Sequence, residues 1–294
     1  MEKSKVYFTK EISEQQLVKL YDTLQANLDG KIAIKVHSGE KGNQNYLHPS
    51  FMKNIVNHLN GTIVECNTAY DGARNTTEKH EQLMKEHGWS DYFPVDILDS
   101  SEPDMILEIP NGKVLKKNYV GKNLANYDSM LVLSHFKGHP MGGYGGALKQ
   151  LSIGIASSKG KRYIHCAGIE NRSYDDMFKT DQIKFLEAMA DAASSVTNHF
   201  KDKIAYINIM CNMSIDCDCC AVAEDPCMKD IGMLASLDPV ALDQACIDLI
   251  YQSTDEGKDH MIERIESRHG IHTIESASAL GVGSREYDLI SIDE

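Results

Sequence analysis

Five of the chain's eight cysteines are crowded into one short stretch, and this crowding is the strongest indication of chemistry in the sequence. They are Cys211, Cys217, Cys219, Cys220 and Cys227. Thiolates are the soft ligands that hold zinc or iron–sulfur clusters. The spacing C-x-C-C-x6-C differs from the bacterial ferredoxin run and from the paired C-x2-C of a zinc ribbon. The stretch therefore predicts a metal or redox site without deciding which, and a loop of reduced thiols or a disulfide stays open.

The candidate metal ligands are Cys217, Cys219, Cys220 and Cys227, completed by Cys211 or a histidine. Cys219 and Cys220 are adjacent, so they point in opposite directions in an extended chain, and only a sharp bend lets one site use both. Acidic residues flank these cysteines, namely Asp216, Asp218, Glu224 and Asp225. Their charge helps to retain a cation but raises thiol pKa values when no metal is bound. A metal site is therefore more attractive here than a redox dithiol.

A second segment, residues 134–149, leaves a buried strand and enters a helix, which is where open α/β sheets bind ligands. We expect His135 and His139 to ligate a metal or to act in acid–base catalysis, with Lys137 as a further catalytic candidate that adds positive charge. Glycines let backbone N–H groups approach an anion at a helix N-terminus. The expected anion-binding set is Gly142, Gly143, Gly145, Gly146 and Lys149. The pattern G-G-x-G-G is no nucleotide fingerprint, and a glycine-rich turn with solvated histidines is the alternative.

Three further positions extend the candidate site. Arg74, in the loop after the second expected strand, could bind a carboxylate or phosphate through two hydrogen bonds from its planar guanidinium group. His37 ends the first expected strand, Lys41 lies in the loop after it, and both could line the same cleft. His165 and Cys166 form another candidate ligand pair. The simpler interpretation at each position is a surface residue or a strand end.

Short apolar runs alternate with amphipathic stretches, which is the pattern of βαβ units. Expected strands are residues 31–37, 62–66, 95–98, 105–109, 115–119, 130–136, 203–210 and 287–292. Expected helices follow residues 49, 76 and 238 and occupy residues 147–155, 180–200 and 262–269. The histidine segment and the cysteine stretch both follow strands, so we expect them at one sheet edge. We predict one α/β domain over residues 1–294, with a mostly parallel mixed sheet flanked by helices and strand-end loops forming a cleft.

The bulk composition excludes several classes of partner. The formal net charge of −13 argues against nucleic acid or an anionic membrane as the main partner. No run of about 18 apolar residues exists, and the N-terminus lacks an apolar region, so we expect no membrane span and a cytoplasmic location. Clustered cysteines in that compartment favour metal or redox use over structural disulfides. Cys246 lies on an apolar helical stripe and is expected in the core.

Four segments together resemble one family. They are residues 36–43 with Tyr46 and Pro49, residues 70–74 with Thr77, His80 and Gly88, residues 134–149, and residues 216–219 with Pro226, 230–232 and 236–243. The family is domain of unknown function 362, often labelled iron–sulfur cluster-binding, and the resemblance covers about residues 30–255. The family is distantly similar to the N-terminal part of nickel-dependent lactate racemase. By fold analogy this implies a cleft for a small carboxylate or a cofactor.

The chain departs from the family pattern in one respect. Many members carry a ferredoxin-like insert with two four-cysteine runs. The corresponding stretch here, residues 157–166, is short and holds one cysteine. The resemblance therefore implies that an iron–sulfur cluster, if bound, uses Cys217, Cys219, Cys220 and Cys227, with zinc as the alternative metal.

The leading hypothesis is a cytosolic redox or metal-assisted enzyme that acts on a small anionic substrate beside a thiolate metal site. A second hypothesis is a non-catalytic electron carrier or binding protein with a redox protein as its partner. A third is an enzyme in which zinc has a purely structural role and holds a loop in place. The sequence leaves all three open.

Overall fold

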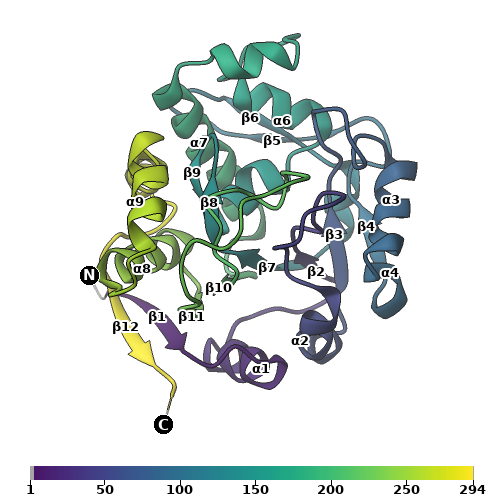
Figure 1. The fold of residues 1–294 in the computed structure, drawn as a ribbon. Coiled ribbons are helices and arrows are strands. Elements are labelled where there is room, and N and C mark those ends of the chain that lie inside the picture. The colour runs from purple at the N-terminus through teal and green to yellow at the C-terminus, as the bar shows by residue number, and fades with distance from the viewer. Residues whose placement is uncertain (1–2, 294) are drawn as a thin grey trace.

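The computed structural model describes residues 3–293, which are built around an eight-stranded sheet (Figure 1). The strands in sheet order are β12 (Tyr287–Ser291), β1 (Ser4–Thr9), β11 (Gly232–Ser236), β10 (Ile204–Met210), β7 (Ser129–His135), β2 (Ile32–Lys35), β3 (Thr62–Glu65) and β4 (Val95–Ile97). Neighbouring strands are parallel except where β11 meets β1 and β10. The predicted α/β fold with a mostly parallel mixed sheet is confirmed. Two further pairs are β5 (Met105–Glu108) with β6 (Lys117–Val120) and β8 (Lys137–His139) with β9 (Gly143–Gly145).

Helices cover both faces of the sheet. The α-helices are α1 (Glu14–Thr23), α2 (Lys53–Leu59), α3 (Thr77–Glu86), α4 (Trp89–Tyr92), α5 (Ala147–Lys149), α6 (Ser158–His165), α7 (Gln182–Phe200), α8 (Pro239–Gln252), α9 (Lys258–Ser267) and α10 (Ile271–Ala279). Short 3-10 turns are η1 (Pro49–Met52), η2 (Lys122–Asn126) and η4 (Asp175–Lys179), and η3 (Gln150–Gly154) is a π-helix. In the described part of the chain, no helix is long and apolar enough to cross a membrane.

The alternation of side chains along β7 explains the two layers. Leu131 and Leu133 pack into a cluster with apolar residues of α1, α2 and α4. Met130 and Val132 point the other way, into a cluster with α5, α7 and α8. A parallel strand covered on both faces is apolar throughout, and all seven residues of β7 are buried. Figure 1 shows α1 and α2 on one side of the sheet and α7 on the other.

The expected elements differ from the observed ones at a few places. The predicted helix 147–155 is a single turn, α5, followed by the π-helix η3. The predicted loop after β7 contains the β8–β9 hairpin. Strands β1 and β11 and helices α1, α6 and α10 were not predicted. The sequence of α6, Ser-Lys-Gly-Lys-Arg-Tyr-Ile-His, has too few apolar residues for its periodicity to predict a helix. The helix packs against α7 and β6.

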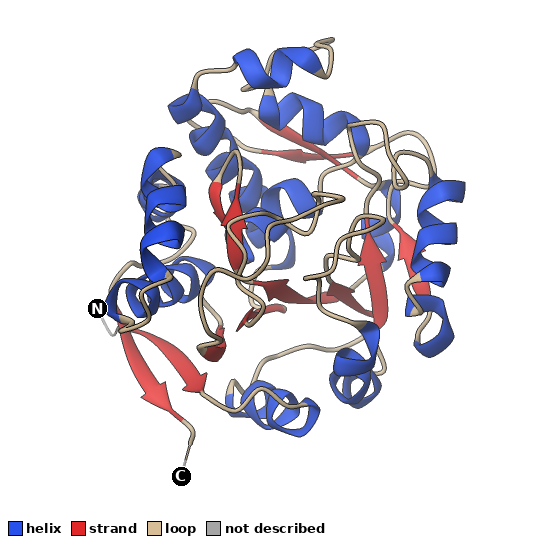
Figure 2. Ribbon diagram, in the orientation of Figure 1, coloured by secondary structure: helices blue, strands red, loops and turns tan. Residues whose placement is uncertain are grey.

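The sheet order decides which loops meet. Strands β7 and β10 are adjacent and parallel, with Ser134 opposite Asn208 and His135 opposite Ile209. The loops that follow them therefore leave the sheet at the same edge. Figure 2 shows the long tan loops gathered over the strand ends between the helical layers.

Candidate functional site

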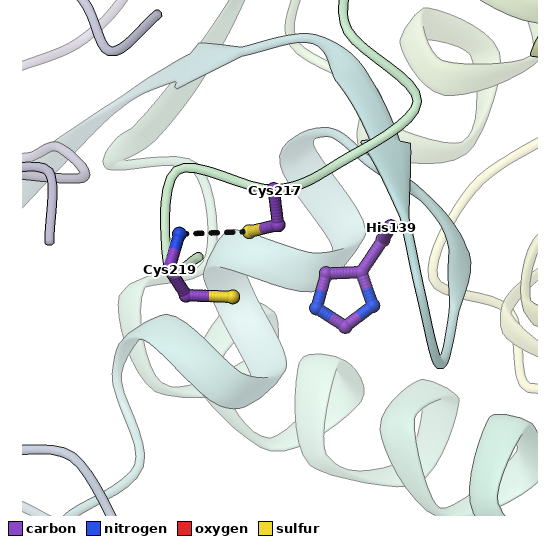
Figure 3. Close-up of side chains that lie close together, drawn as sticks. All are labelled: His139, Cys217 and Cys219. Carbon is purple, nitrogen blue, oxygen red and sulfur yellow. Dashed lines mark hydrogen bonds between the residues drawn. The ribbon is translucent and has the colours of Figure 1, made fainter. Parts of the chain in front are cut away.

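The cysteine loop and the histidine hairpin converge. His139, Cys217 and Cys219 each place one potential metal-ligand atom within 4.8 Å of the others (Figure 3). His139 comes from β8, and the two cysteines come from the loop after β10. The amide of Cys220 donates to the carbonyl of Cys217 at 2.9 Å, so the chain turns sharply between them. This bend brings both Cys219 and Cys220 to the wall of one cavity.

Cys217 lies in a positively charged environment. The ammonium nitrogen of Lys149 is 3.1 Å from its sulfur, and the amide of Cys219 donates to the same sulfur at 3.4 Å. Burial by itself raises the pKa of the Cys217 thiol, but the hydrogen bond with Cys219 and the charge of Lys149 hold that pKa well below its usual value. The expectation that flanking acids raise the thiol pKa is therefore wrong for Cys217, because the nearest charges are cationic.

The acid next to Cys217 is neutralised by two residues of the histidine segment. His135 Nδ1 is 2.9 Å from the Asp218 carboxylate, and Lys137 Nζ is 2.8 Å from it. Burial raises the pKa of Asp218, but the charges of His135 and Lys137 outweigh burial and lower it. His135 Nε2 also contacts the carbonyl of Cys211 at 2.6 Å. Neither His135 nor Lys137 lines the cavity, so both act here by fixing the cysteine loop.

His139 faces the sulfur atoms as a hydrogen-bond donor. Its Nδ1 accepts from the amides of Met141 at 3.1 Å and Gly142 at 2.9 Å. Burial and the charge of Lys149 lower the pKa of His139, so the ring is neutral and its proton sits on Nε2. The ring therefore donates to a thiolate as it stands, and it ligates a metal through Nε2 only if the turn at Met141 and Gly142 opens.

Of the remaining predicted thiols, Cys220 belongs to the same group as Cys217 and Cys219, and Cys227 does not. A hydrogen bond between the thiols of Cys219 and Cys220 is the main cause that lowers the pKa of Cys220. Cys227 is not part of this group, because its thiol donates to the carbonyl of Met213 at 3.3 Å and does not line the cavity. His165 lines the cavity, whereas Cys166 is buried elsewhere.

The cavity has a volume of about 290 Å³ and a basic lining. Of its described lining residues, four are lysines or arginines and one is a carboxylate: Lys35, Arg74, Lys149, Lys161 and Glu65. All five are nine-tenths or more buried. A basic cavity in a chain with a net charge of −13 is suited to an anion.

The charged pair Lys35–Glu65 was not predicted. Lys35 Nζ lies 2.7 Å from Glu65 Oε2 and 3.2 Å from Gln150 Oε1. Burial lowers the pKa of Lys35, and the charge of Lys35 outweighs burial to hold the pKa of Glu65 well below its usual value. The signal was a single charge at the end of each apolar strand, in Ile-Ala-Ile-Lys and Thr-Ile-Val-Glu. Charges are rarely fully buried unless they are paired.

The glycines of the hairpin serve packing rather than the cavity. A Cβ on Gly146 would lie 2.5 Å from Asp243 Oδ1, and one on Gly143, with φ +82°, would lie 2.9 Å from Gly270. The amides at the start of α5, of Ala147 and Leu148, donate to Asp243 at 2.8 and 3.0 Å. The protein's own carboxylate thus occupies the helix start expected for an anion. The four predicted glycines, including Gly142 and Gly145, are absent from the cavity lining.

The two predicted basic residues of the early loops have different positions. Arg74 lines the cavity, and its guanidinium donates to Glu40 at 3.2 Å and to the hydroxyl of Tyr70 at 2.8 Å. Lys41 is exposed, and its nearest acid is Glu86 at 3.2 Å. Arg74 therefore belongs to the site, and Lys41 lies outside it.

Comparison with known proteins gives a family and partial structural likenesses. No curated protein matched the chain. The lactate racemase apoprotein from Thermoanaerobacterium thermosaccharolyticum is 18% identical with a TM-score of 0.43, covering 70% of this chain and 50% of that one. A structural-genomics protein from Thermotoga maritima is 10% identical with a TM-score of 0.44, covering 92% of this chain and 59% of that one. The chain thus spans 50% and 59% of these proteins' lengths, and likenesses of this strength carry no argument about function.

The model of one protein family, described as Domain of unknown function (DUF362), matches residues 32–248. The match includes the cavity, the cysteine loop and the histidine hairpin, and it spans more than half of the 294 residues. The chain belongs to the DUF362 family.

Proposed function

We propose that this protein is a metal-assisted enzyme that acts on a small organic anion, with a soft metal held by the thiolates of Cys217, Cys219 and Cys220. One observation carries the proposal: Cys219, Cys220 and four basic side chains line one cavity, and the Cys217 sulfur lies within 4.8 Å of the Cys219 sulfur. A ligand cavity beside a metal site is the usual arrangement for metal-assisted chemistry.

The donor set fits a soft metal. Metal ligands must be deprotonated, and Cys217 is held as a thiolate by Lys149. Cys219 and Cys220 share a hydrogen bond, and a metal replaces its proton. Three protein ligands would leave room for water or substrate on the metal, which is typical of catalytic rather than structural sites. A metal held by these thiolates would polarise a bound oxygen or lower the pKa of a bound water.

The chain's own residues supply binding and positioning. Lys149 and the Nε2–H of His139 donate to sulfur, which stabilises thiolate charge. His135 and Lys137 fix the Asp218 turn on which the cysteines sit. Arg74, Lys35 and Lys161 present positive charge to the anion.

The test is metal analysis of protein purified without oxygen, with iron, zinc and nickel measured per chain. We expect one soft metal per wild-type chain and at least a tenfold lower occupancy in Cys219→Ser. Cys227→Ser is the matched control, because its thiol lies outside the group, and it should keep wild-type occupancy. Equal occupancy in the two variants, or a metal-free wild type, would contradict the proposal.

The same samples decide between a single ion and a cluster. A broad absorption band near 400 nm with about four irons per chain, lost in Cys219→Ser, indicates an iron–sulfur cluster. The observation that favours this second candidate is the grouping of three thiols, since Cys219 is hydrogen-bonded to both Cys217 and Cys220. A cluster would need one further donor beside them. Colourless protein with one zinc supports the single-ion site.

A further inference from the structure

The cavity contains a buried hydrogen-bond donor without a partner. Gln150 is 5% exposed, and its Oε1 accepts from Lys35 Nζ at 3.2 Å. Because an ammonium group only donates, this contact fixes the amide so that its Nε2 is the other atom. That Nε2 has no hydrogen-bond partner among the described residues. Buried donors are rarely left unpaired, so this one points to a ligand.

The same cavity contains one cation without an acidic partner. Lys35 pairs with Glu65 at 2.7 Å, and Arg74 pairs with Glu40 at 3.2 Å. Lys149 faces the Cys217 sulfur at 3.1 Å. Lys161 forms no ion pair within the described residues, and its Nζ donates to the carbonyl of Ala156 at 2.6 Å. An ammonium has three protons, so two are left for a ligand, and one negative charge balances the group.

The local backbone maintains this arrangement. Gln150 begins the π-helix η3, and π-helical turns occur frequently at functional sites. Gly154 ends it, and a Cβ there would lie 2.5 Å from Gln150 Oε1 and 2.9 Å from Lys35 Cε. The absence of a side chain at Gly154 therefore allows the contact that orients the free amide nitrogen.

Part of the cavity lining is apolar. Its members are Met141, Ile153, Tyr174, Met177 and Phe178. Phe178 is 59% exposed and Tyr174 is 40% exposed. Their rings pack edge to face, with the ring centroids 5.2 Å apart. Exposed aromatic residues at a cavity rim provide a surface on which a flat ligand group can stack.

We propose that the cavity binds a small organic monocarboxylate, with its carboxylate between Gln150 Nε2 and Lys161 and an apolar or aromatic arm against Tyr174 and Phe178. The inference rests on the proposed function in that this carboxylate is the substrate class of the same cavity. It uses none of the thiols, so it can be tested on protein without metal.

The experiment is titration calorimetry of chelator-treated, metal-free protein with 3-phenylpropionate. Two matched compounds separate the parts of the ligand: 3-phenylpropanamide lacks the charge, and propionate lacks the ring. We expect 3-phenylpropionate to bind and each matched compound to bind at least tenfold more weakly. A neutral amide that binds as well as the acid, or a wild type that binds no 3-phenylpropionate, overturns the inference.

Variants then locate the two parts. Gln150→Leu and Lys161→Met should each raise the Kd for 3-phenylpropionate at least tenfold, since each removes a hydrogen bond to a charged group. Lys159→Met on the same helix and Ile169→Ala, also apolar and exposed, lie outside the cavity and should leave the Kd unchanged. Phe178 is exposed, so Phe178→Ala should leave the fold intact. It should raise the Kd for 3-phenylpropionate about threefold or more. Equal effects of Lys161→Met and Lys159→Met overturn the carboxylate assignment.

The two proposals fail separately. Binding of 3-phenylpropionate by metal-free protein, with no metal found in the purified wild type, removes the metal-assisted function and leaves the carboxylate site. Tight metal binding without carboxylate binding removes the carboxylate site alone. Circular dichroism of each variant shows that a changed Kd does not come from unfolding.

Discussion

At the scale of single residues, the most consequential contact is the buried pair of Lys35 and Glu65. Their side chains are 1% and 4% exposed. Glu65 also accepts from the amide of Ser38 at 2.8 Å and from its hydroxyl at 3.0 Å. A buried charge is tolerated when it is paired and hydrogen-bonded, and removing one partner leaves the other uncompensated.

Glu65→Gln should therefore destabilise the protein strongly. We expect the free energy of unfolding to fall by about 3–5 kcal/mol, because the buried Lys35 ammonium loses its counter-charge. Urea unfolding followed by circular dichroism measures the change. Glu86→Gln is the control, since Glu86 pairs with Lys41 at the surface, where a lost pair costs about 1 kcal/mol or less. A similar fall in the free energy of unfolding in both variants would contradict the expectation that the buried pair contributes more than the surface pair.

At the scale of elements, Asp243 joins four parts of the chain. From α8 its carboxylate accepts from the amides that begin α5, from Asn208 of β10 at 2.7 Å and from the hydroxyl of Tyr144 in β9 at 3.2 Å. It is fully buried, and burial raises its pKa to about 6 despite these donors. The same residue thus holds the start of the segment that carries Lys149 and Gln150.

The raised pKa of Asp243 predicts a direction for the pH dependence. The native pKa of about 6 exceeds the unfolded value of about 3.9, so the native state binds more protons between these values. This contribution to stability is present below about pH 4 and is lost as the pH rises through about 6. Asp243→Asn does not titrate, so the advantage of the wild type over the variant should shrink by about 2 kcal/mol from pH 4.5 to 7.

Urea unfolding at the two pH values measures that difference. The variant should be less stable at both pH values. The introduced asparagine side chain would have only one acceptor oxygen, whereas the backbone N–H groups of Ala147 and Leu148 donate to the two different oxygens of Asp243. One buried donor is therefore left unpaired, at a cost of about 1–3 kcal/mol. Parallel pH profiles of the two proteins would contradict the assignment of a titrating Asp243.

At the scale of the whole molecule, the order of strands creates the site. Strand β7 lies between β10 and β2, so loops that are distant in sequence leave one edge of the sheet side by side. His80 and His165 are also held neutral in this interior. His80 is fully buried and His165 is 7% exposed, and burial lowers the pKa of His80 to about 3 and that of His165 to about 4. Both must be protonated when the chain unfolds in acid.

The two histidines predict acid sensitivity of the whole fold. Their native pKa values lie below the unfolded value of about 6.5, so the stability they contribute is present above pH 6.5 and is lost as the pH falls. Each should cost about 2 kcal/mol at pH 5, in the direction opposite to Asp243. We expect His80→Gln to remove one such contribution, measured as a shallower fall of the unfolding free energy between pH 7 and 5. An unchanged slope would mean that His80 is protonated in the native state.

The sequence by itself determined the class of fold and the region of the site. Apolar runs with period two and amphipathic stretches are local properties, so the order of residues is enough to place most strands. Because His139 and Cys217 each follow a strand, their meeting at one edge was also predictable. Helix α6 and strands β1 and β11 could not be predicted in this way, because they are stabilised by neighbours that are distant in sequence.

Only the tertiary structure decided what each side chain contacts. His135 and His139 look equivalent in sequence, yet one turns inward to Asp218 and the other faces Cys217 and Cys219. Lys35 and Gln150, distant in sequence, meet because β2 lies beside β7 and Gly154 leaves room for their contact. Periodicity decides whether a segment is a helix or a strand, but the direction of a side chain and its partners follow from strand order and packing, which no local pattern encodes.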